Sequence, residues 1–419
     1  MLITRDWPCG ARRVSSPRPR IEHRCWCDVL SNAATVSAPC VALVTLTDMT
    51  VPGGASRSVH MLGAGLRRQG HDVATVSRPY AANVGNSLVR RVWRRIDYSS
   101  EEVRRIRGAL GGLAADLRDV PRDTVCIAFE AWSAATCVES GLTTICRVAG
   151  LGSITDEWIR NGFVDGASRH VPWLRTTERH GFQGAARVVA LSSAGREAVA
   201  GLGAAAESVV VIPNGIAAGV CPGPRAVSDC DDAEVRLLCV ANLRPVKGVD
   251  VLATALAGLD DDVRRRVRLV HLGDGNAPGN STFERARDTL TRADVAHEFC
   301  GAVPPERVDA ELRAADLFVL PSRVEMFSNA LLEAMAAALP IVATDAGASA
   351  AVLGERARMD GLVVPPGDAV ALAAALARAI RDPALRRAHG LANRARVETE
   401  FSVERTIDSY AALVREVAR

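Results

Sequence analysis

Residues 316–347 read DLFVLPSRVEMFSNALLEAMAAALPIVATDAG, and this stretch predicts a strand, a loop, a helix and a second strand. The apolar runs 317–320 and 341–343 are the expected strands, and the Ala- and Leu-rich run 329–339 is the expected helix. Such a βαβ unit places its loop and its helix N-terminus at the carboxyl edge of a parallel sheet. Ser328 is expected to cap the helix. Unpaired backbone N–H groups and the helix dipole then predict an anion site, for which phosphate is the commonest occupant.

Two carboxylates belong to this unit, Glu325 in the loop and Glu333 in the helix, eight positions apart. Carboxylates repel phosphate, so beside a phosphate site they are expected to accept hydrogen bonds from sugar hydroxyls. Phosphate donors together with two hydroxyl-binding acids favour a nucleotide sugar as the ligand. The alternative interpretation is that Glu325 is a solvated loop residue and Glu333 lies on the outer surface of the helix.

The run 325–345, EMFSNALLEAMAAALPIVATD, resembles the donor-site signature of the family-4 retaining glycosyltransferases. The resemblance implies that Glu325 contacts the donor sugar and Glu333 the ribose. It further implies that the donor lies along the loop and the start of the helix, at Met326, Phe327, Ser328 and Asn329.

Lys247 is the single lysine of a chain with 51 Lys and Arg residues. It lies in ANLRPVKG, directly after the apolar run 237–240, at a second predicted strand-to-helix turn. A compact ammonium differs from a planar guanidinium, so the lone Lys indicates a site that needs the former; chance is the alternative. The turn also resembles the family, in which the corresponding Lys neutralises the donor diphosphate, often with an Arg. This chain has Asn242 five places earlier and Arg244 nearer, and whether Arg244 assists stays open.

A length of 419 residues fits two α/β domains, and 48% hydrophobic with 24% charged residues is typical of a globular protein. No run approaches the length of a membrane span. The net charge of +3, without a basic face interleaved with aromatics, argues against nucleic acid as a partner. Cysteines such as Cys126, Cys146, Cys239 and Cys300 lie in or beside apolar runs, which is typical of reduced thiols in a cytoplasmic protein.

The predicted organisation has five parts. Residues 1–38 are expected to be a disordered extension without the apolar core of a secretory signal. An N-terminal Rossmann-like, acceptor-binding domain follows at 39–216, and a Pro- and Asp-containing linker at 217–233. The C-terminal Rossmann-like domain, which would bind the nucleotide sugar, spans 234–401. The resemblance implies that the last helix, at 402–419, crosses back onto the first domain.

Gly53 and Gly54 lie in the segment 52–76, PGGASRSVHMLGAGLRRQGHDVATV, which resembles the opening unit of the same glycosyltransferases. The resemblance implies that this Gly-Gly loop faces the cleft and approaches the transferred sugar or the donor phosphates. A structural turn is the alternative. Arg147 lies near the end of the predicted strand 143–148, where members of the family often carry His, and is a candidate for acceptor binding. Trp132 is a further candidate because aromatic rings stack on sugars, with core packing as its alternative.

Gly273 and Gly275 form a GDG turn after the apolar run 267–272. Pro278 occupies the place of the third glycine, so a dinucleotide fingerprint is not present. The resemblance implies a loop beside the nucleotide base. In the first half of the chain, a run of Arg90, Arg91, Arg94 and Arg95 around Trp93 is consistent with an anionic lipid surface or a phosphorylated acceptor. A solvated arginine face is the other interpretation.

These observations predict two doubly wound α/β domains that face a central cleft, the GT-B fold. The implied activity is retaining transfer of a hexose-type sugar from a nucleoside diphosphate sugar to a hydroxyl of a glycolipid, glycan or small natural product. No cofactor is expected, and no metal, because the GDG loop has a single Asp and does not look like an Asp-x-Asp pair that presents carboxylates to a divalent cation. The reaction would take place in the cytoplasm, with contact to the inner face of the membrane as an option; the oligomeric state is not specified.

Three alternatives stay open. A catalytically silent sugar-nucleotide-binding protein is consistent with Met326, Asn242 and Ala351, where the chain departs from the family pattern. A sugar-nucleotide epimerase of the same fold is the second. An NAD-dependent oxidoreductase is the third and is opposed by the missing fingerprint.

Overall fold

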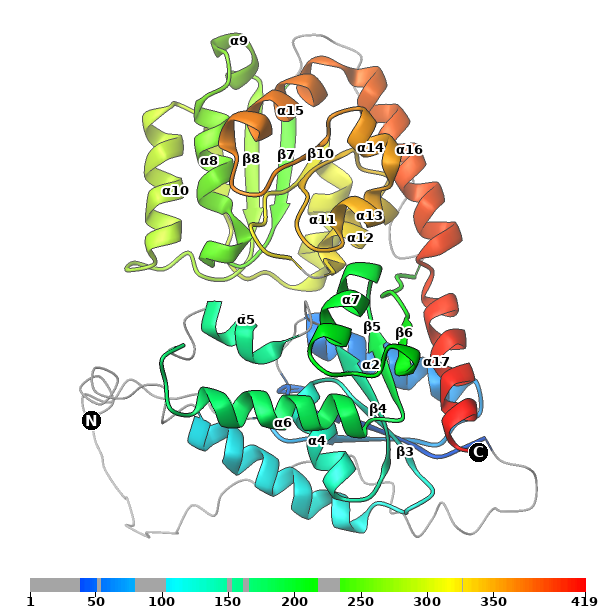
Figure 1. Cartoon of the computed structure of the whole chain (residues 1–419). Coiled ribbons are helices and arrows are strands. Elements are labelled where there is room, and N and C mark those ends of the chain that lie inside the picture. Colours follow the sequence, from blue (N-terminus) through cyan, green and yellow to red (C-terminus); the bar gives the residue numbers. More distant parts are fainter. Residues whose placement is uncertain are drawn as a thin grey trace, which may run out of the picture.

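The chain folds into two α/β lobes, each built on a six-stranded parallel sheet (Figure 1). A computed structural model describes residues 38–50, 54–79, 103–148, 153–160, 166–217, 234–325 and 327–419. Most strands are largely apolar, as expected where helices cover both faces of a parallel sheet. In β1, for example, all five residues are buried.

The sheet of the first lobe has the strand order β2-β1-β3-β4-β5-β6, and each neighbouring pair is parallel. Its strands are β1 Val41–Thr45, β2 Val73–Ser77, β3 Val125–Ala128, β4 Thr143–Val148, β5 Arg187–Ala190 and β6 Val209–Val211. Around it lie α2 Gly54–Arg68, a helical segment at 103–116, α4 Ala131–Glu139, α5 Ile154–Arg160, α6 Val171–Gly184 and α7 Ser193–Gly201.

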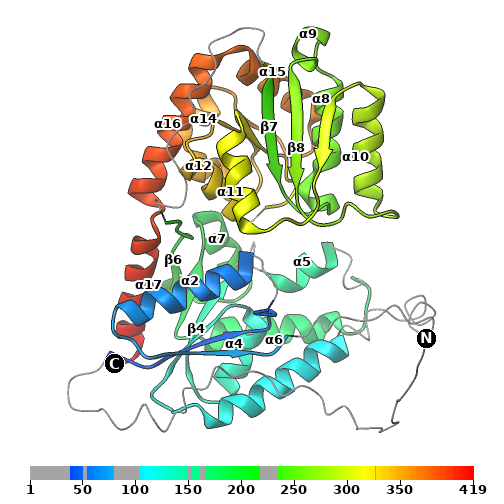
Figure 2. The same cartoon turned by 180° about the vertical axis from the view of Figure 1, so that it is seen from behind.

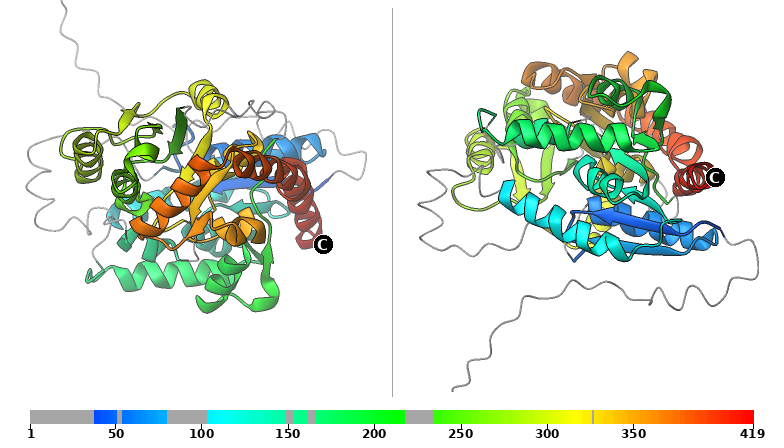
Figure 3. Two further views of the ribbon diagram at one scale, coloured as in Figure 1. Left: turned by 90° about the horizontal axis from the view of Figure 1, so that it is seen from above. Right: turned by 60° about the horizontal axis from the view of Figure 1, so that its bottom comes forward.

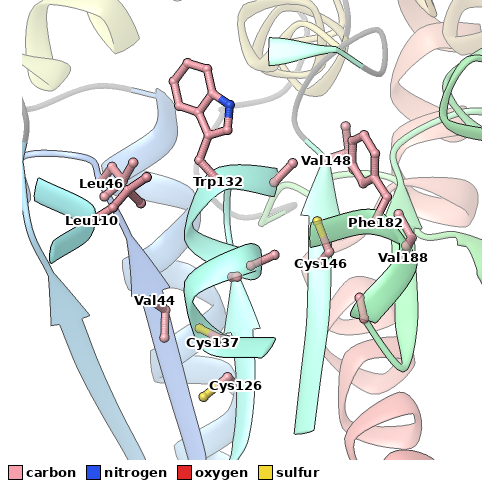
Figure 4. Close-up of a cluster of buried hydrophobic side chains, with 14 of the residues drawn as sticks. Val44, Leu46, Leu110, Cys126, Trp132, Cys137, Cys146, Val148, Phe182 and Val188 are labelled. Atoms are coloured by element: carbon pink, nitrogen blue, oxygen red, sulfur yellow. The ribbon is translucent and has the colours of Figure 1, made fainter. Parts of the chain in front are cut away.

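Two hydrophobic cores cover the two faces of this sheet. One contains the sheet residues that face α4, α6 and the segment 103–116, and Figure 4 shows Trp132, Cys146 and Phe182 within it. The other core joins the opposite face of the sheet to α2 and to the last helix, α17 Val403–Val417. The last helix of the chain is therefore part of the first lobe.

The sheet of the second lobe has the order β12-β11-β10-β7-β8-β9. Its strands are β7 Val235–Val240, β8 Val267–Leu272, β9 Ala296–Phe299, β10 Leu317–Leu320, β11 Ile341–Thr344 and β12 Val363–Val364. From β7 the chain builds outward to β9 on one side and then, starting at β10, to β12 on the other. The strand order therefore reverses between β7 and β10, which makes the carboxyl ends of these two strands the switch point of the sheet.

Helices cover both faces of this second sheet. One hydrophobic core joins it to α8 Val249–Ala257, α9 Asp261–Arg264, α10 Ser281–Arg292 and α15 Ala369–Arg381. The other joins it to α11 Pro305–Ala314, α12 Asn329–Ala336, α13 Ser349–Leu353, α14 Glu355–Met359 and α16 Pro383–Glu400.

The chain returns to the first lobe between α16 and α17. Figures 1 and 2 show α16 along the second lobe and α17 along the first, and in both views of Figure 3 the C-terminus lies at the edge of the molecule. Tyr410 and Val414 of α17 are buried in the first-lobe core. At the crossing, Ile216 forms an isolated β-bridge with Ser402, so the two places where the backbone leaves a lobe lie side by side.

The fold agrees with the predicted GT-B arrangement, and the apolar runs 267–272 and 317–320 coincide with β8 and β10. The helix expected at 329–339 ends earlier, at Ala336, because Ala338 takes a left-handed backbone (φ 57°) before Pro340. The predicted extension to residue 37, the basic run 90–95 and the linker from 218 to 233 lie outside the described residues.

Candidate active site

The switch point brings two predicted loops together. After β7 the chain forms the short 3₁₀ turn η4, Pro245–Lys247, and after β10 it forms the loop 321–325. The backbone N–H of Arg323 donates to the carbonyl of Val246 over 2.8 Å, so the two loops are hydrogen-bonded to each other. Open α/β sheets bind ligands at this position, above the carboxyl ends of the strands where the order reverses.

Lys247 and Glu325 form an ion pair in this place. The Lys247 Nζ donates to Oε2 of Glu325 over 2.7 Å, and the Ser322 hydroxyl is 3.2 Å from the same oxygen. Glu325 is only 8% exposed, and a buried carboxylate needs such a partner because it has lost its hydration. The two residues that the sequence singled out independently therefore lie in contact, 78 positions apart in the chain.

Arg323 and Asp250 hold this arrangement, and the sequence analysis missed both. The guanidinium of Arg323 binds the carboxylate of Asp250 through two hydrogen bonds of 2.7 and 3.0 Å, and it also donates to the carbonyl of Pro245. Burial would raise the pKa of Asp250, but Arg323 outweighs this and holds that pKa below its ordinary value. The available signal was an acid in the first turn of the predicted helix and a base two positions before Glu325.

Gly248 permits the close approach of the two loops. It has a left-handed backbone (φ 65°), and a Cβ at this position would lie 2.0 Å from the carbonyl oxygen of Pro321. The GDG loop lies against the same turn, since the N–H of Leu243 donates to the carbonyl of Asp274 over 2.8 Å. Gly273 is equally constrained, because its Cβ would lie 2.0 Å from the carbonyl oxygen of Ala241. The predicted donor loops are thus contiguous, with Gly275 in the GDG loop and the exposed residues Asn242 and Arg244 in the turn.

The start of α12 completes this edge. Ser328 is the N-cap and its hydroxyl accepts from the N–H of Leu331 over 3.2 Å, which confirms the predicted cap. Asn329 follows as the first helical residue, and Gly54 of the first lobe lies opposite: a Cβ on Gly54 would be 3.2 Å from Asn329 Nδ2. Phe327 packs against Phe401 in the core. Gly53 and Met326 lie outside the described residues.

Glu333 lies one turn further along α12 and faces a cavity of about 320 Å³ between the lobes. Its Oε1 accepts from Nη1 of Arg57 in α2 over 2.7 Å, so the pair bridges the two lobes. Burial raises the pKa of Glu333, and the charge of Arg57 opposes that rise. Sequence reasoning did not find Arg57, although it lies three residues after Gly54 inside the segment that carried the resemblance. The cavity is lined by residues of α2, α11 and α12 and by the segment 214–217.

The two residues proposed for the acceptor are both buried. Arg147 is 5% exposed and its Nη2 donates to Oδ1 of Asn214 over 2.7 Å. Trp132 is 0% exposed, and its indole N–H is directed at the carbonyl of Leu174 at 3.3 Å. The expectation that Trp132 stacks on an acceptor needs correction, because its side chain is fully buried in the first-lobe core. Trp132 is therefore a core residue, which was the alternative interpretation of this tryptophan.

Within the described ranges, no three His, Cys, Asp or Glu side chains gather in a way that could hold a metal ion. No helix in the same part of the chain combines the length and the apolar character that a membrane crossing requires. Cys126, Cys137, Cys146 and Cys239 are buried free thiols, as the sequence predicted for three of them; Cys300 is half-buried.

Two Rossmann-like lobes whose loops face each other define the GT-B class of proteins. Comparison with protein families gives two matches: residues 52–219 match the model described as Glycosyltransferase Family 4, and residues 234–382 match the model described as Glycosyl transferases group 1. Together the two matches cover most of the chain. The chain belongs to the family-4 glycosyltransferases.

Curated relatives include a D-inositol 3-phosphate glycosyltransferase from Kineococcus radiotolerans, 34% identical over 264 residues, which are 58% of this chain and 60% of that protein. Another is the lipopolysaccharide core biosynthesis mannosyltransferase LpcC of Rhizobium leguminosarum bv. viciae, 32% identical over 204 residues, with coverage of 48% and 53%. The chain thus matches only about half the length of these relatives.

Solved structures with the same fold include sucrose-phosphate synthase from Thermosynechococcus elongatus, with a TM-score of 0.72 and 20% identity over 90% of this chain and 99% of that one. Anabaena Alr3699/HepE in complex with UDP-glucose has a TM-score of 0.67 and 17% identity over 90% and 100% of the two chains. At sequence identities of 20% and 17%, the structural similarity shows a shared fold.

Proposed function

We propose that this protein is a retaining glycosyltransferase that moves a hexose-type sugar from a nucleoside diphosphate sugar to a hydroxyl group of a glycolipid, glycan or small natural product. The observation that carries the proposal is the contact of Lys247 with Glu325 at the switch point, beside the capped start of α12. A cation and a helix N-terminus suit a diphosphate, and the neighbouring acid suits a sugar.

In this proposal Lys247 and the backbone N–H groups at the start of α12 meet the charge that develops on the departing diphosphate. Glu325 accepts hydrogen bonds from the sugar, and Glu333 accepts them from the ribose. The bond between the sugar and the diphosphate oxygen breaks on the face where the acceptor oxygen bonds to the same carbon. The leaving phosphate takes the acceptor proton, so the reaction needs no protein base.

The comparisons support sugar transfer from a nucleotide sugar. The relatives carry the names of an inositol phosphate glycosyltransferase and a lipopolysaccharide core mannosyltransferase, and the HepE structure contains UDP-glucose. Free thiols at Cys126, Cys146 and Cys239 support a reducing compartment such as the cytoplasm.

Thermal-shift titration with UDP, GDP, ADP and dTDP sugars tests the proposal. One nucleotide class is expected to raise the melting temperature, because a ligand that binds the folded state stabilises it. Slow hydrolysis of the bound donor without acceptor, followed by NMR of the anomeric proton, is expected to release sugar with its original configuration. Binding without hydrolysis or transfer would instead identify a silent sugar-nucleotide-binding protein, and no stabilisation by any nucleotide would contradict the proposal.

Replacing Arg57 by alanine is expected to tighten nucleoside diphosphate binding. Arg57 occupies the carboxylate of Glu333, which the ribose needs, so the ion pair competes with the ligand. The Arg57 side chain is 55% exposed, and such a pair is worth about 0.2–1 kcal/mol, which corresponds to at most about a fivefold gain in affinity. Calorimetric titration measures the gain, with Arg57→Lys as the control that keeps the charge. Weaker binding in Arg57→Ala would show that Arg57 itself holds the ligand.

A further inference from the structure

A line of hydrogen bonds joins the two lobes at the wall of the cavity that Glu333 faces, and Asn214 and Asn329 both line that cavity. Arg147, near the end of β4, donates to Oδ1 of Asn214 over 2.7 Å, and Nδ2 of Asn214 donates to Oδ1 of Asn329 over 2.9 Å. Arg147 and Asn214 are 5% and 7% exposed. Asn329 is the first residue of α12. The line therefore runs from the first-lobe sheet to the helix start that faces the proposed donor.

Arg147 is held from two sides. Its guanidinium lies over the ring of Phe129, 5.1 Å from the ring centre. Its charge also acts on the buried phenol of Tyr410 in α17: burial raises the pKa of Tyr410 to about 12, and Arg147 opposes that rise. A buried cation in such surroundings needs a hydrogen-bond acceptor, which Asn214 supplies.

Asn214 lies where the chain crosses between the lobes and has little room to move. The hydroxyl of Thr406 donates to the carbonyl of Pro213 over 3.0 Å. On the other side, a Cβ on Gly215 would lie 2.4 Å from the carbonyl oxygen of Ser402. The hydrogen bond from Thr406 and the close approach of the Ser402 backbone thus hold the residues before and after Asn214, and the Asn214 side chain bridges Arg147 and Asn329.

The chemistry of the three groups sets the direction of the line. A guanidinium has N–H donors and no acceptor, so the amide oxygen of Asn214 must face Arg147 and its NH₂ group must face Asn329. The amide oxygen of Asn329 then accepts, and its NH₂ group is turned toward Gly54 of the opposite lobe, as the 3.2 Å separation between Nδ2 and the Cβ position of Gly54 indicates.

We infer that Arg147 is a positioning residue, which acts through Asn214 to keep the N–H donors of Asn329 aimed at the phosphate oxygens of the donor. This inference rests on the proposed function. If both amide side chains had the opposite orientation, Asn329 would direct its side-chain carbonyl oxygen at the phosphate, and the two would repel each other. Arg147 thereby receives a different role from the acceptor contact that the sequence suggested.

Asn214→Asp is the decisive substitution, because a carboxylate of the same shape keeps an acceptor for Arg147 but has no N–H for Asn329. The Asn329 amide must then turn to donate, and its oxygen faces the donor. Affinity for the nucleoside diphosphate that stabilises the wild type is expected to fall about tenfold. The melting temperature is expected to stay level or rise, because the new carboxylate pairs with Arg147. In an Asn329→Ala background, Asn214→Asp should have no further effect on affinity.

A melting experiment without ligand tests the line independently of the proposed function. Arg147→Met and Asn329→Ala remove residues at opposite ends of the line, and their combined drop in melting temperature is expected to be smaller than the sum of the single drops. Asn393→Ala is the matched control for Asn329→Ala, since Asn393 is a buried amide of the second lobe that donates to Leu339. The drop in melting temperature caused by Asn393→Ala should add to the drop caused by Arg147→Met.

Additive drops for Arg147→Met and Asn329→Ala would overturn the hydrogen-bond line. Loss of affinity in Asn214→Asp that persists in the Asn329→Ala background would overturn the positioning role. If the wild type binds no nucleoside diphosphate, the proposed function and the positioning role both fail, while the melting experiment still decides whether the line exists.

Discussion

Replacing Lys247 by methionine is expected to lower the affinity for the nucleoside diphosphate by about thirtyfold or more, because truncating one partner of a buried charged contact costs about 2 kcal/mol or more. Methionine keeps most of the aliphatic stem and removes the ammonium. The expected result is a much smaller nucleotide-dependent rise in melting temperature, together with a calorimetric Kd that is about thirtyfold or more above that of the wild type.

The ion pair with Glu325 complicates this experiment and also supplies its control. Lys247→Met leaves the carboxylate of Glu325 buried and without its ammonium, which by itself destabilises the loop. The double variant Lys247→Met with Glu325→Gln removes both charges and restores electrical balance. If the ammonium binds the diphosphate, the double variant also fails to bind; binding at wild-type strength in the double variant would rule out this role.

Arg244→Ala is the matched control within the same turn. Arg244 is exposed and lies three positions before Lys247, so its removal tests whether any cation in the turn has the same effect. A small change in affinity for Arg244→Ala beside a large one for Lys247→Met would assign the diphosphate to the ammonium. Equal losses would show that the turn contributes a general positive field.

Replacing Glu325 by glutamine is expected to lower kcat/KM for the donor by about a hundredfold, since misplacing the reacting group by about 1 Å has an effect of that size. Glutamine keeps an oxygen for Lys247 and for Ser322 but has a weaker acceptor for sugar hydroxyls. The affinity for the nucleoside diphosphate without sugar should stay within about threefold of the wild type, or about 0.7 kcal/mol. Steady-state kinetics and calorimetry measure the two quantities.

Glu333→Gln is the variant to compare with Glu325→Gln, because the two acids are proposed to bind different parts of the donor. Glu333 lies on the helix and faces the cavity between the lobes, so its replacement is expected to weaken the binding of the nucleoside diphosphate itself. Glu325→Gln should therefore lower kcat/KM and leave the affinity for the nucleoside diphosphate nearly unchanged, whereas Glu333→Gln should lower that affinity. A Glu325→Gln variant that loses nucleotide affinity, or a Glu333→Gln variant with intact turnover, would contradict the proposed division between sugar and ribose.

The sequence predicted much of the fold because parallel strands covered on both faces are continuous apolar runs, and β8 and β10 are examples. Helices with polar outer faces were harder to predict. The helices α10 and α16 are rich in Arg and other polar residues, so neither stands out as an apolar run, and neither was predicted.

The loops of the candidate site could be predicted because each follows a strand in the sequence. Their mutual contacts could not, because these depend on strand order. Lys247 and Glu325 meet only because β7 and β10 are neighbours, and Arg57 meets Glu333 across 276 positions of sequence. The line from Arg147 to Asn329 likewise depends on the placement of the two lobes, which no local pattern encodes.

The return of α17 to the first lobe determines where this protein can be divided. Exchange of sugar-donor halves between relatives is an attractive way to build hybrid enzymes, and a cut after β6 alone would remove the helix that covers one face of the first sheet. A workable hybrid must replace an internal insert that ends near Ser402 and keep the recipient's own final helix. In sequence, the second lobe is thus an insertion within the first lobe rather than a domain attached to its end.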